Sequence, residues 1–462
     1  MNCVHNKTQN STYQSKISIL ENNQVSKNKV CLNSTNTRLS RDVVSFRSNN
    51  PGNYDYNIYG DKPEEIRQLI LPDFKALFKT LPKAELHVHL KGATTLSVIR
   101  QELRRKGYGE EEIATATTFP DYFVDLDHFR KTYTRFSKLL ITPQEMRDSA
   151  YFTCIRAAED NVRYLELRIN PRSKGQNPYN MINMVTEGIR DAQTHLKNGV
   201  NFKQIVKLLI LAKRDNSQEE VMENAKIAVE LAKNPDNLVV GFDIAGAEAH
   251  HTILKHEGAI KFVKDKGLHV TVHAGETPTS IDNKYSLTGA QSIRAAVDLD
   301  SDRIGHGLHL IDDPELVELV KRKGITIESP PTANVSIKSV RNWKGHPFKQ
   351  MLDAGVKVAV CTDNPTLFKT TISREYERLY KHSYINSWDT MKTLVMNGIN
   401  GGFLSLSEKK DLEKDFKAEL LKIEKNKYFK DVIKQYLTPE KSAGAFDFIL
   451  KNLEKLLKGT LK

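Results

Sequence analysis

The sequence predicts an α/β fold: a parallel (β/α)8 TIM barrel with extra helices. Eight short apolar runs alternate with segments of helical spacing, which is typical of strands joined by helical crossovers. Most of the runs are almost entirely apolar, as expected for strands covered on both faces. Eight such strands fit a closed barrel better than an open sheet. The runs span residues 85–90, 163–169, 206–213, 238–244, 269–273, 303–307, 324–329 and 357–361.

The segments between the runs carry apolar residues at helical spacing, as Ala290, Ile293 and Ala296 do. Residues 108–157, between the first two predicted strands, form too long a stretch for a simple crossover. This stretch either covers the barrel mouth as a lid or packs as ordinary helices, and the sequence leaves both possibilities open.

The chain divides into an N-terminal extension, residues 1–60, and a barrel region, residues 61–462, which ends in capping helices. The extension is polar, low in complexity and rich in Asn, Ser, Thr and Lys, so we expect it to be disordered. A short helix is expected over residues 64–70. Pro72 interrupts it, and a second helical segment is expected over residues 73–79.

Composition and charge argue against several classes of protein. No run approaches the roughly 18 apolar residues of a membrane span, and the N-terminus lacks the apolar core of a secretory signal. The four cysteines are scattered, which disfavours a disulfide framework and favours a reducing, cytoplasmic location. Much of the net charge of +12 lies near the N-terminus, and without a compact basic stripe no nucleic-acid partner is expected. The sequence does not predict an oligomeric state.

Two histidines separated by one valine, His87 and His89, end the first predicted strand in “ELHVHLKGA”. Side chains two residues apart on a strand point to the same side, so both imidazoles can bind one metal ion. The strands of a (β/α)8 barrel end at a common face, where His273 can supply a third nitrogen and Asp363 a carboxylate. Three nitrogens and one oxygen suit a zinc ion, one per chain, that activates water.

Two more polar residues follow predicted strands at this face. Glu276 lies three residues after His273 and can act as an acid or base on a substrate. His306, between two glycines, can orient the water and stabilise charge on it. Ordinary structural roles are also open, since Glu276 could cap the following helix and Asp363 could start a turn. Six such residues on four strand ends of one barrel nevertheless favour a catalytic site.

Together these segments resemble the adenosine deaminase family of metal-dependent (β/α)8 barrels, over about residues 81–380. The motifs that carry the resemblance are “PKAELHVHLKGA”, “VRYLELRINP”, “GFDIAGAE”, “HAGE”, “DRIGHGLHL”, “PPTANV” and “CTDNP”. The resemblance implies an aminohydrolase that converts a 6-aminopurine nucleoside, such as adenosine, to its 6-oxo product and ammonia. It also implies zinc ligation by His87, His89, His273 and Asp363.

The same resemblance implies roles for the residues around the metal. Glu276 would donate a proton to N1 of the purine, and a zinc-activated water oriented by His306 and Asp363 would attack C6. Gly246 would offer its backbone N–H to N3, because glycine permits close approach. His89 would also lie against the substrate.

The sequence departs from the family pattern at three places. Lys91 stands where an aspartate commonly contacts the ribose 5′-hydroxyl, and it would suit a phosphate or carboxylate better unless it turns to solvent. Asn364 stands where a second aspartate normally contacts purine N7, and its amide can donate to N7 without protonation. The third departure is Ala247 in “GAE” and Ala333 in “PTAN”, where aspartate and serine are usual.

Three functional hypotheses follow from these observations. The leading one is zinc-dependent deamination of an adenine nucleoside or a close derivative. The second, prompted by Lys91, is deamination of a 5′-phosphorylated substrate such as AMP or N6-methyl-AMP. The third belongs to another class, a barrel that binds a purine without catalysis, and the complete set of metal ligands together with Glu276 argues against it.

Overall fold

The computed structural model describes residues 72–172, 175–196, 204–282 and 284–437. The extension predicted over residues 1–60 and the helix predicted over residues 64–70 lie outside them and stay predictions. Helix α3 (Pro72–Thr80) confirms the second predicted helical segment. Within the described ranges, no helix is both long enough and apolar enough to span a lipid bilayer.

The centre of the fold is a ring of eight parallel strands. Their order around the ring follows the chain, and each strand pairs with the next. His89 N donates to Asp363 O (2.9 Å) and Asp363 N donates to His87 O (2.8 Å), which joins the last strand to the first. The predicted barrel is therefore confirmed. The strands are β1 (Lys83–His89), β2 (Val162–Ile169), β3 (Ile205–Lys213), β4 (Val239–Ala245), β5 (His269–Ala274), β8 (Arg303–His306), β9 (Thr326–Ser329) and β10 (Lys357–Val360).

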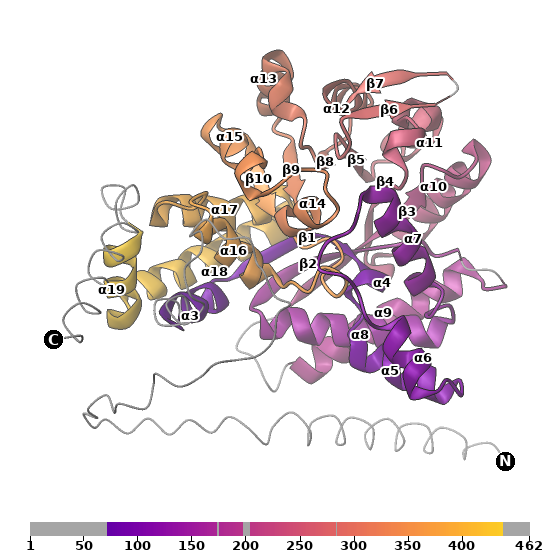
Figure 1. Ribbon diagram of the computed structural model, residues 1–462, viewed down its shortest axis with the longest axis horizontal. Coiled ribbons are helices and arrows are strands. Elements are labelled where there is room, and N and C mark those ends of the chain that lie inside the picture. Colours follow the sequence, from indigo (N-terminus) through magenta and orange to yellow (C-terminus); the bar gives the residue numbers. More distant parts are fainter. Residues whose placement is uncertain (1–71, 173–174, 197–203, 283, 438–462) are drawn as a thin grey trace. The chain divides into compact units, whose positions relative to one another are not determined.

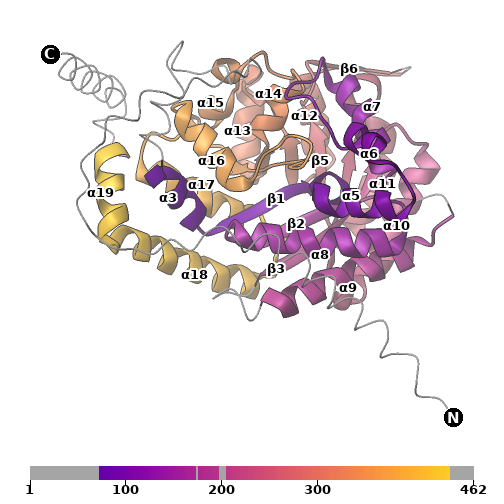
Figure 2. The ribbon, with the colours of Figure 1, turned by 60° about the horizontal axis from the view of Figure 1, so that its bottom comes forward.

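Helices surround the ring and connect successive strands (Figure 1). The crossover helices are α8 (Pro143–Glu159), α9 (Pro178–Leu196), α10 (Gln218–Ala232), α11 (Glu257–Asp265), α12 (Gly289–Asp298), α13 (Pro314–Lys323) and α15 (Phe348–Asp353), whereas α16 (Ile372–Lys381) and α17 (Trp388–Gly401) follow the last strand. In Figure 2, α8 and α9 run along the outside of β1, β2 and β3. The C-terminal helices α18 (Leu406–Lys425) and α19 (Lys427–Tyr436) extend this outer layer.

Several helices begin at a motif that is legible in the sequence. In a capping box, a Ser or Thr side chain accepts the N–H of the third helical residue, whose Glu or Gln side chain accepts the N–H of the cap. Thr142 starts α8 in this way, Ser217 starts α10, Thr288 starts α12 and Ser405 starts α18. These local hydrogen bonds fix the residue at which each of these helices begins.

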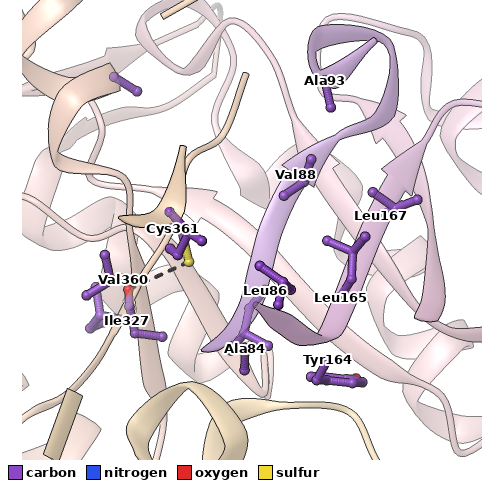
Figure 3. Close-up of a cluster of buried hydrophobic side chains, with 14 of the residues drawn as sticks. Ala84, Leu86, Val88, Ala93, Tyr164, Leu165, Leu167, Ile327, Val360 and Cys361 are labelled. Carbon is purple, nitrogen blue, oxygen red and sulfur yellow. Dashed lines mark hydrogen bonds between the residues drawn. The ribbon is translucent and has the colours of Figure 1, made fainter. Parts of the chain in front are cut away.

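Strand β1 shows how the core directs the site residues inward. Ala84 and Leu86 pack outward against Gly398 and Gly401 of α17, which lack side chains and allow close approach. Figure 3 shows Ala84, Leu86 and Val88 on β1 within an apolar cluster that includes side chains of β2, β9 and β10. Because side chains alternate along a strand, the residues between them point into the barrel. The apolar packing of one face thus places both histidines of “HVH” on the other.

The predicted strand ends are correct to within one or two residues, and the differences have local causes. Leu238 has a left-handed backbone (φ 60°), so β4 begins one residue after it. Gly324 (φ 68°) ends helix α13, so β9 starts later than predicted. The antiparallel hairpin of β6 (Thr279–Ile281) and β7 (Ser286–Thr288) was not predicted, because its strands are short and polar.

Candidate metal centre and active site

The four predicted metal ligands lie together where the strands end. His89 Nε2 is 3.3 Å from His273 Nε2, and Asp363 Oδ1 is 3.2 Å from His89 Nε2 and 3.7 Å from His87 Nε2. The three imidazoles each offer a nitrogen within 4.8 Å of the other two. Residues separated by up to 276 positions in the chain therefore share one small region.

Two of the histidines are oriented by buried carboxylates. Glu328 Oε2 lies 2.6 Å from His87 Nδ1, and Asp243 Oδ1 lies 3.2 Å from His273 Nδ1. A carboxylate on one ring nitrogen fixes the ring orientation and leaves the other nitrogen for a metal. Burial lowers the pKa of His87 well below its ordinary value and that of His273 to about 4, so both rings stay neutral at pH 7. Neutral imidazole is the form that binds metals.

Buried arginines hold the two carboxylates in turn. Arg168 Nη1 is 3.1 Å from Asp243 Oδ2, and Arg168 Nη2 is 2.8 Å from Glu328 Oε2. Arg303 Nε contacts the other oxygen of Glu328 at 2.6 Å and also pairs with Glu166. Burial alone would raise the pKa of Glu328, but the two arginines hold it well below its ordinary value. The metal cluster is thus supported by a buried layer of arginine–carboxylate ion pairs.

The geometry of the cluster suits a zinc ion. Zn–N distances of about 2.0–2.1 Å in a tetrahedral site place ligand atoms roughly 3.3–3.4 Å apart, close to the 3.2 Å and 3.3 Å separations observed here. Gly305 contributes space, since a Cβ at this position would lie only 3.0 Å from the ring of His87. Donor chemistry and spacing therefore both fit one divalent ion.

Glu276 and His306 face each other beside the cluster. Glu276 Oε1 lies 3.5 Å from His306 Nε2, and both side chains are almost completely buried. Burial raises the pKa of Glu276 to about 7, so a large fraction of this carboxyl carries a proton near neutral pH. Burial alone would lower the pKa of His306, but the charges of Glu276 and Asp363 raise it above its ordinary value.

The backbone of two site residues is unusual. His306 (φ 65°) and Asp363 (φ 63°) have left-handed conformations, which are rare outside glycine and concentrate at active sites. Asn334 orients the ring of His306, because its Oδ1 lies 2.6 Å from His306 Nδ1. The Nδ2 of Asn334 lies 3.0 Å from His346 Nε2. This chain of contacts leaves Nε2 of His306 facing Glu276.

A cavity of about 380 Å³ opens onto the cluster, a volume in the range of small-molecule sites. Helix α7 (Leu126–Ser137) forms one of its walls, with Phe129 and Tyr133 among the lining residues. Arg130 and Asp127 of α7 contact Asp215 and His250, which follow β3 and β4, and Figure 1 shows α7 beside these strands. Helix α7 is therefore the part of the 108–157 stretch that covers the mouth, whereas α8 packs on the outside.

The predicted substrate contacts line the same cavity. Lys91 lies in the short helix α4 (Leu90–Ala93) and donates from Nζ to Ser137 O at 3.1 Å, so it does not simply turn to solvent. Gly246 has φ 115°, a conformation suited to glycine. Asn364 donates from Nδ2 to Asp363 Oδ1 (2.7 Å), and no described residue donates a hydrogen bond to its buried Oδ1.

Sequence reasoning missed the residues that support the site. Glu328, Asp243 and Asn334 contact three histidines of the predicted site, which are His87, His273 and His306. These residues could have been found from the sequence as charged or amide side chains inside a predicted apolar strand or a recognised motif. Glu328 in “TIES” and Asp243 in “GFDIAGAE” are examples. Such groups are rarely buried without a partner, so each one indicates a polar network.

Glu248 positions the loop that carries Glu276. Its buried carboxylate accepts hydrogen bonds from the backbone N–H groups of Gly275 (2.8 Å), Glu276 (2.7 Å) and Thr277 (3.0 Å). Ser292 Oγ donates to Oε1 of this carboxylate at 2.5 Å, the oxygen that also accepts from Gly275. Glu248, the acidic residue of “GAE”, thus fixes the backbone just after β5.

We expect Glu248→Gln to lower both stability and turnover. The amide would present N–H groups to N–H donors, leaving buried groups unpaired at a cost of about 1–3 kcal/mol each. Urea unfolding and steady-state kinetics measure the two effects. The matched control is Glu257→Gln on the exposed side of α11, where Lys261 is the partner. Equal stability and turnover in the two variants would contradict this role.

Comparison with known proteins places the chain in a family. The adenosine deaminase family model matches residues 82–418. The adenosine deaminase of Clostridium botulinum strain Okra is 30% identical over 351 residues, covering 74% of this chain and 99% of the relative. The chain belongs to the adenosine deaminase family. The adenosine deaminase of Enterococcus faecalis is also 30% identical, over 72% of this chain and 95% of its own.

Solved structures agree with this membership. The Arabidopsis N6-mAMP deaminase MAPDA is 26% identical with a TM-score of 0.65, covering 74% of this chain and 99% of its own. Arabidopsis ADAL complexed with IMP is 25% identical with a TM-score of 0.64, covering 75% and 99%. As a member of the adenosine deaminase family the chain is an aminohydrolase, and its imidazole cluster fits the metal dependence of that family.

Proposed function

We propose that the chain is a zinc-dependent enzyme that hydrolytically deaminates a 6-aminopurine nucleoside such as adenosine, or a close derivative. The observation that carries the proposal is the pairing of three imidazoles that could hold a metal ion with the buried Glu276, whose pKa burial raises to about 7, in one cavity. The adenosine deaminases among its relatives support the choice of a 6-aminopurine.

The side chains divide the chemistry between them. His87, His89, His273 and Asp363 hold the metal, which when bound lowers the pKa of a water molecule to about 7. The protonated carboxyl of Glu276 donates to purine N1, which makes C6 electrophilic. Water then adds at C6, the bond to the amino nitrogen breaks, and ammonia leaves with formation of the 6-oxo group.

Other residues position the attacking water and the purine ring. His306, fixed by Asn334, presents Nε2 toward the reacting centre and stabilises negative charge that develops there. The backbone N–H of Gly246 donates to N3. The amide nitrogen of Asn364 has two hydrogens, so it can contact Asp363 and donate to N7 at the same time.

A substrate panel tests the proposal. Zinc-loaded protein is mixed with adenosine, AMP, N6-methyl-AMP and adenine, and formation of the 6-oxopurine product is followed, because N6-methyl-AMP releases methylamine and the other three release ammonia. We expect turnover of at least one adenine nucleoside or its 5′-phosphate, with the 6-oxopurine as product. Stoichiometric zinc without turnover of any of these would contradict the proposal and favour a barrel that binds purines without catalysis.

A 5′-phosphorylated substrate is the second candidate, and a specific observation favours it. Lys91 lines the cavity at the position where the sequence departs from the family pattern. The N6-mAMP deaminase and the IMP complex among the structural relatives point in the same direction. The same panel separates the two candidates.

A further inference from the structure

The outer wall of the cavity is strongly basic. We call this group of cations the basic wall, and its members are Lys91, Arg130, Lys138, Arg172 and Lys213. Among the residues that line the cavity, the acidic ones are Asp215 in this part and Glu276 and Asp363 at the metal cluster. A neutral nucleoside substrate would not require such an excess of positive charge in the cavity.

The arginines of the basic wall are already paired. Arg130 lies 3.2 Å from Asp215 and 3.4 Å from Asp127, and Arg172 lies 2.6 Å from Glu223. These ion pairs are structural, because they join α7 and the loop after β2 to neighbouring segments. The charge that remains for a ligand is therefore carried by the lysines.

Lys213 is the last residue of β3 and lies at the barrel mouth. Among the described residues, no ion pair or hydrogen bond to its ammonium group is found, and its side chain lines the cavity. In the strand register its partner is Ala245, which precedes Gly246 and lines the same cavity. Lys213 is therefore a half-buried cation directed at the space beside the expected purine contact.

Lys91 lines the same cavity from helix α4. Its bond to Ser137 O uses one of three N–H donors and leaves two for a ligand. Lys91 and Lys213 both line this cavity, so their positive charges face the same space. Two half-buried ammonium groups that repel each other are stabilised when an anion lies between them.

We propose that Lys91 and Lys213 form an anion subsite that binds the 5′-phosphate of the substrate. The inference rests on the proposed function and narrows its substrate class to 5′-phosphorylated 6-aminopurine nucleosides. The cavity that the two lysines line also exposes His89, His273 and Asp363 of the metal cluster. A nucleotide bound with C6 at the metal would extend its 5′ end toward the lysines.

The test compares zinc-loaded wild type with Lys213→Met on AMP and adenosine. We expect the ratio of kcat/KM for AMP over adenosine to fall about ten- to hundredfold, as when one hydrogen bond to a charged group is lost. Lys213→Arg should restore most of this ratio. The matched control is Lys255→Met, because Lys255 also donates to a backbone carbonyl on this rim but lies outside the cavity. Its ratio should stay at the wild-type value.

Inorganic phosphate provides a readout that needs no AMP turnover. We expect phosphate to inhibit adenosine deamination competitively and to raise the melting temperature of wild type and Lys255→Met more than that of Lys213→Met. Adenosine turnover with an unchanged ratio, or with no difference in phosphate protection between the variants, would overturn the anion subsite and leave the proposed function standing. Absence of turnover on every purine would overturn the proposed function itself.

Discussion

Glu276→Gln should lower kcat by about 10²–10⁴-fold while the protein keeps its zinc, because positioned proton donors contribute rate factors of this size. Glutamine has nearly the shape of glutamic acid, so the buried site stays filled, but its amide cannot give up a proton to purine N1. Steady-state kinetics on zinc-loaded protein measure the loss. Metal analysis of the same samples shows whether the cluster is intact.

The pH profile distinguishes a proton donor from a residue that only fills space. Burial raises the pKa of Glu276 to about 7, so its acidic form decreases as the pH rises through that value. If this form is the active one, wild-type kcat/KM should fall on the alkaline side of about pH 7. The residual activity of Glu276→Gln should lack this decrease. Near-normal turnover in the variant would contradict the assigned role.

His89→Ala should remove most of the bound metal. His89 Nε2 lies 3.3 Å from His273 Nε2 and 3.2 Å from Asp363 Oδ1. Its removal therefore takes away the donor that lies next to both of these ligands. Replacing even the outer partners of metal ligands costs roughly 10–100-fold in affinity, and loss of a ligand should cost more. The measurement is zinc per chain after dialysis against a chelator.

The control for this prediction is an exposed histidine at the same end of the barrel. His250 contacts Asp127 of α7 at 3.0 Å and does not belong to the metal cluster. His250→Ala should therefore keep wild-type zinc. Zinc retention in His89→Ala equal to that of His250→Ala would refute the ligand assignment.

Much of the fold could be predicted from the sequence, because the patterns that identify strands and helices lie within short segments of the chain. Apolar runs with covered faces identify strands, and the alternation of side chains along β1 places His87 and His89 on one side. The C-terminal face of a (β/α)8 barrel then brings His273 and Asp363 to the same region. The observed distances confirm that these four residues meet.

What the sequence did not reveal depends on contacts between distant elements. Glu328 supports His87 across 241 positions, and Asn334 supports His306 from another strand connection. No periodicity encodes which buried carboxylate faces which imidazole, since strand register sets that. The direction of Lys91 is a similar case, because the position of Ser137 decides it. The hairpin of β6 and β7 has too little apolar character to give a signal.

A zinc titration of metal-free protein tests the central claim most directly, since it links the four ligands to the chemistry. Chelated protein receives zinc in small steps while ammonia release from the best 6-aminopurine substrate is measured. We expect activity to be absent at the start, to rise in proportion to zinc and to stop rising at one equivalent per chain. Deamination that proceeds without metal, or zinc binding that never produces deamination, would contradict it.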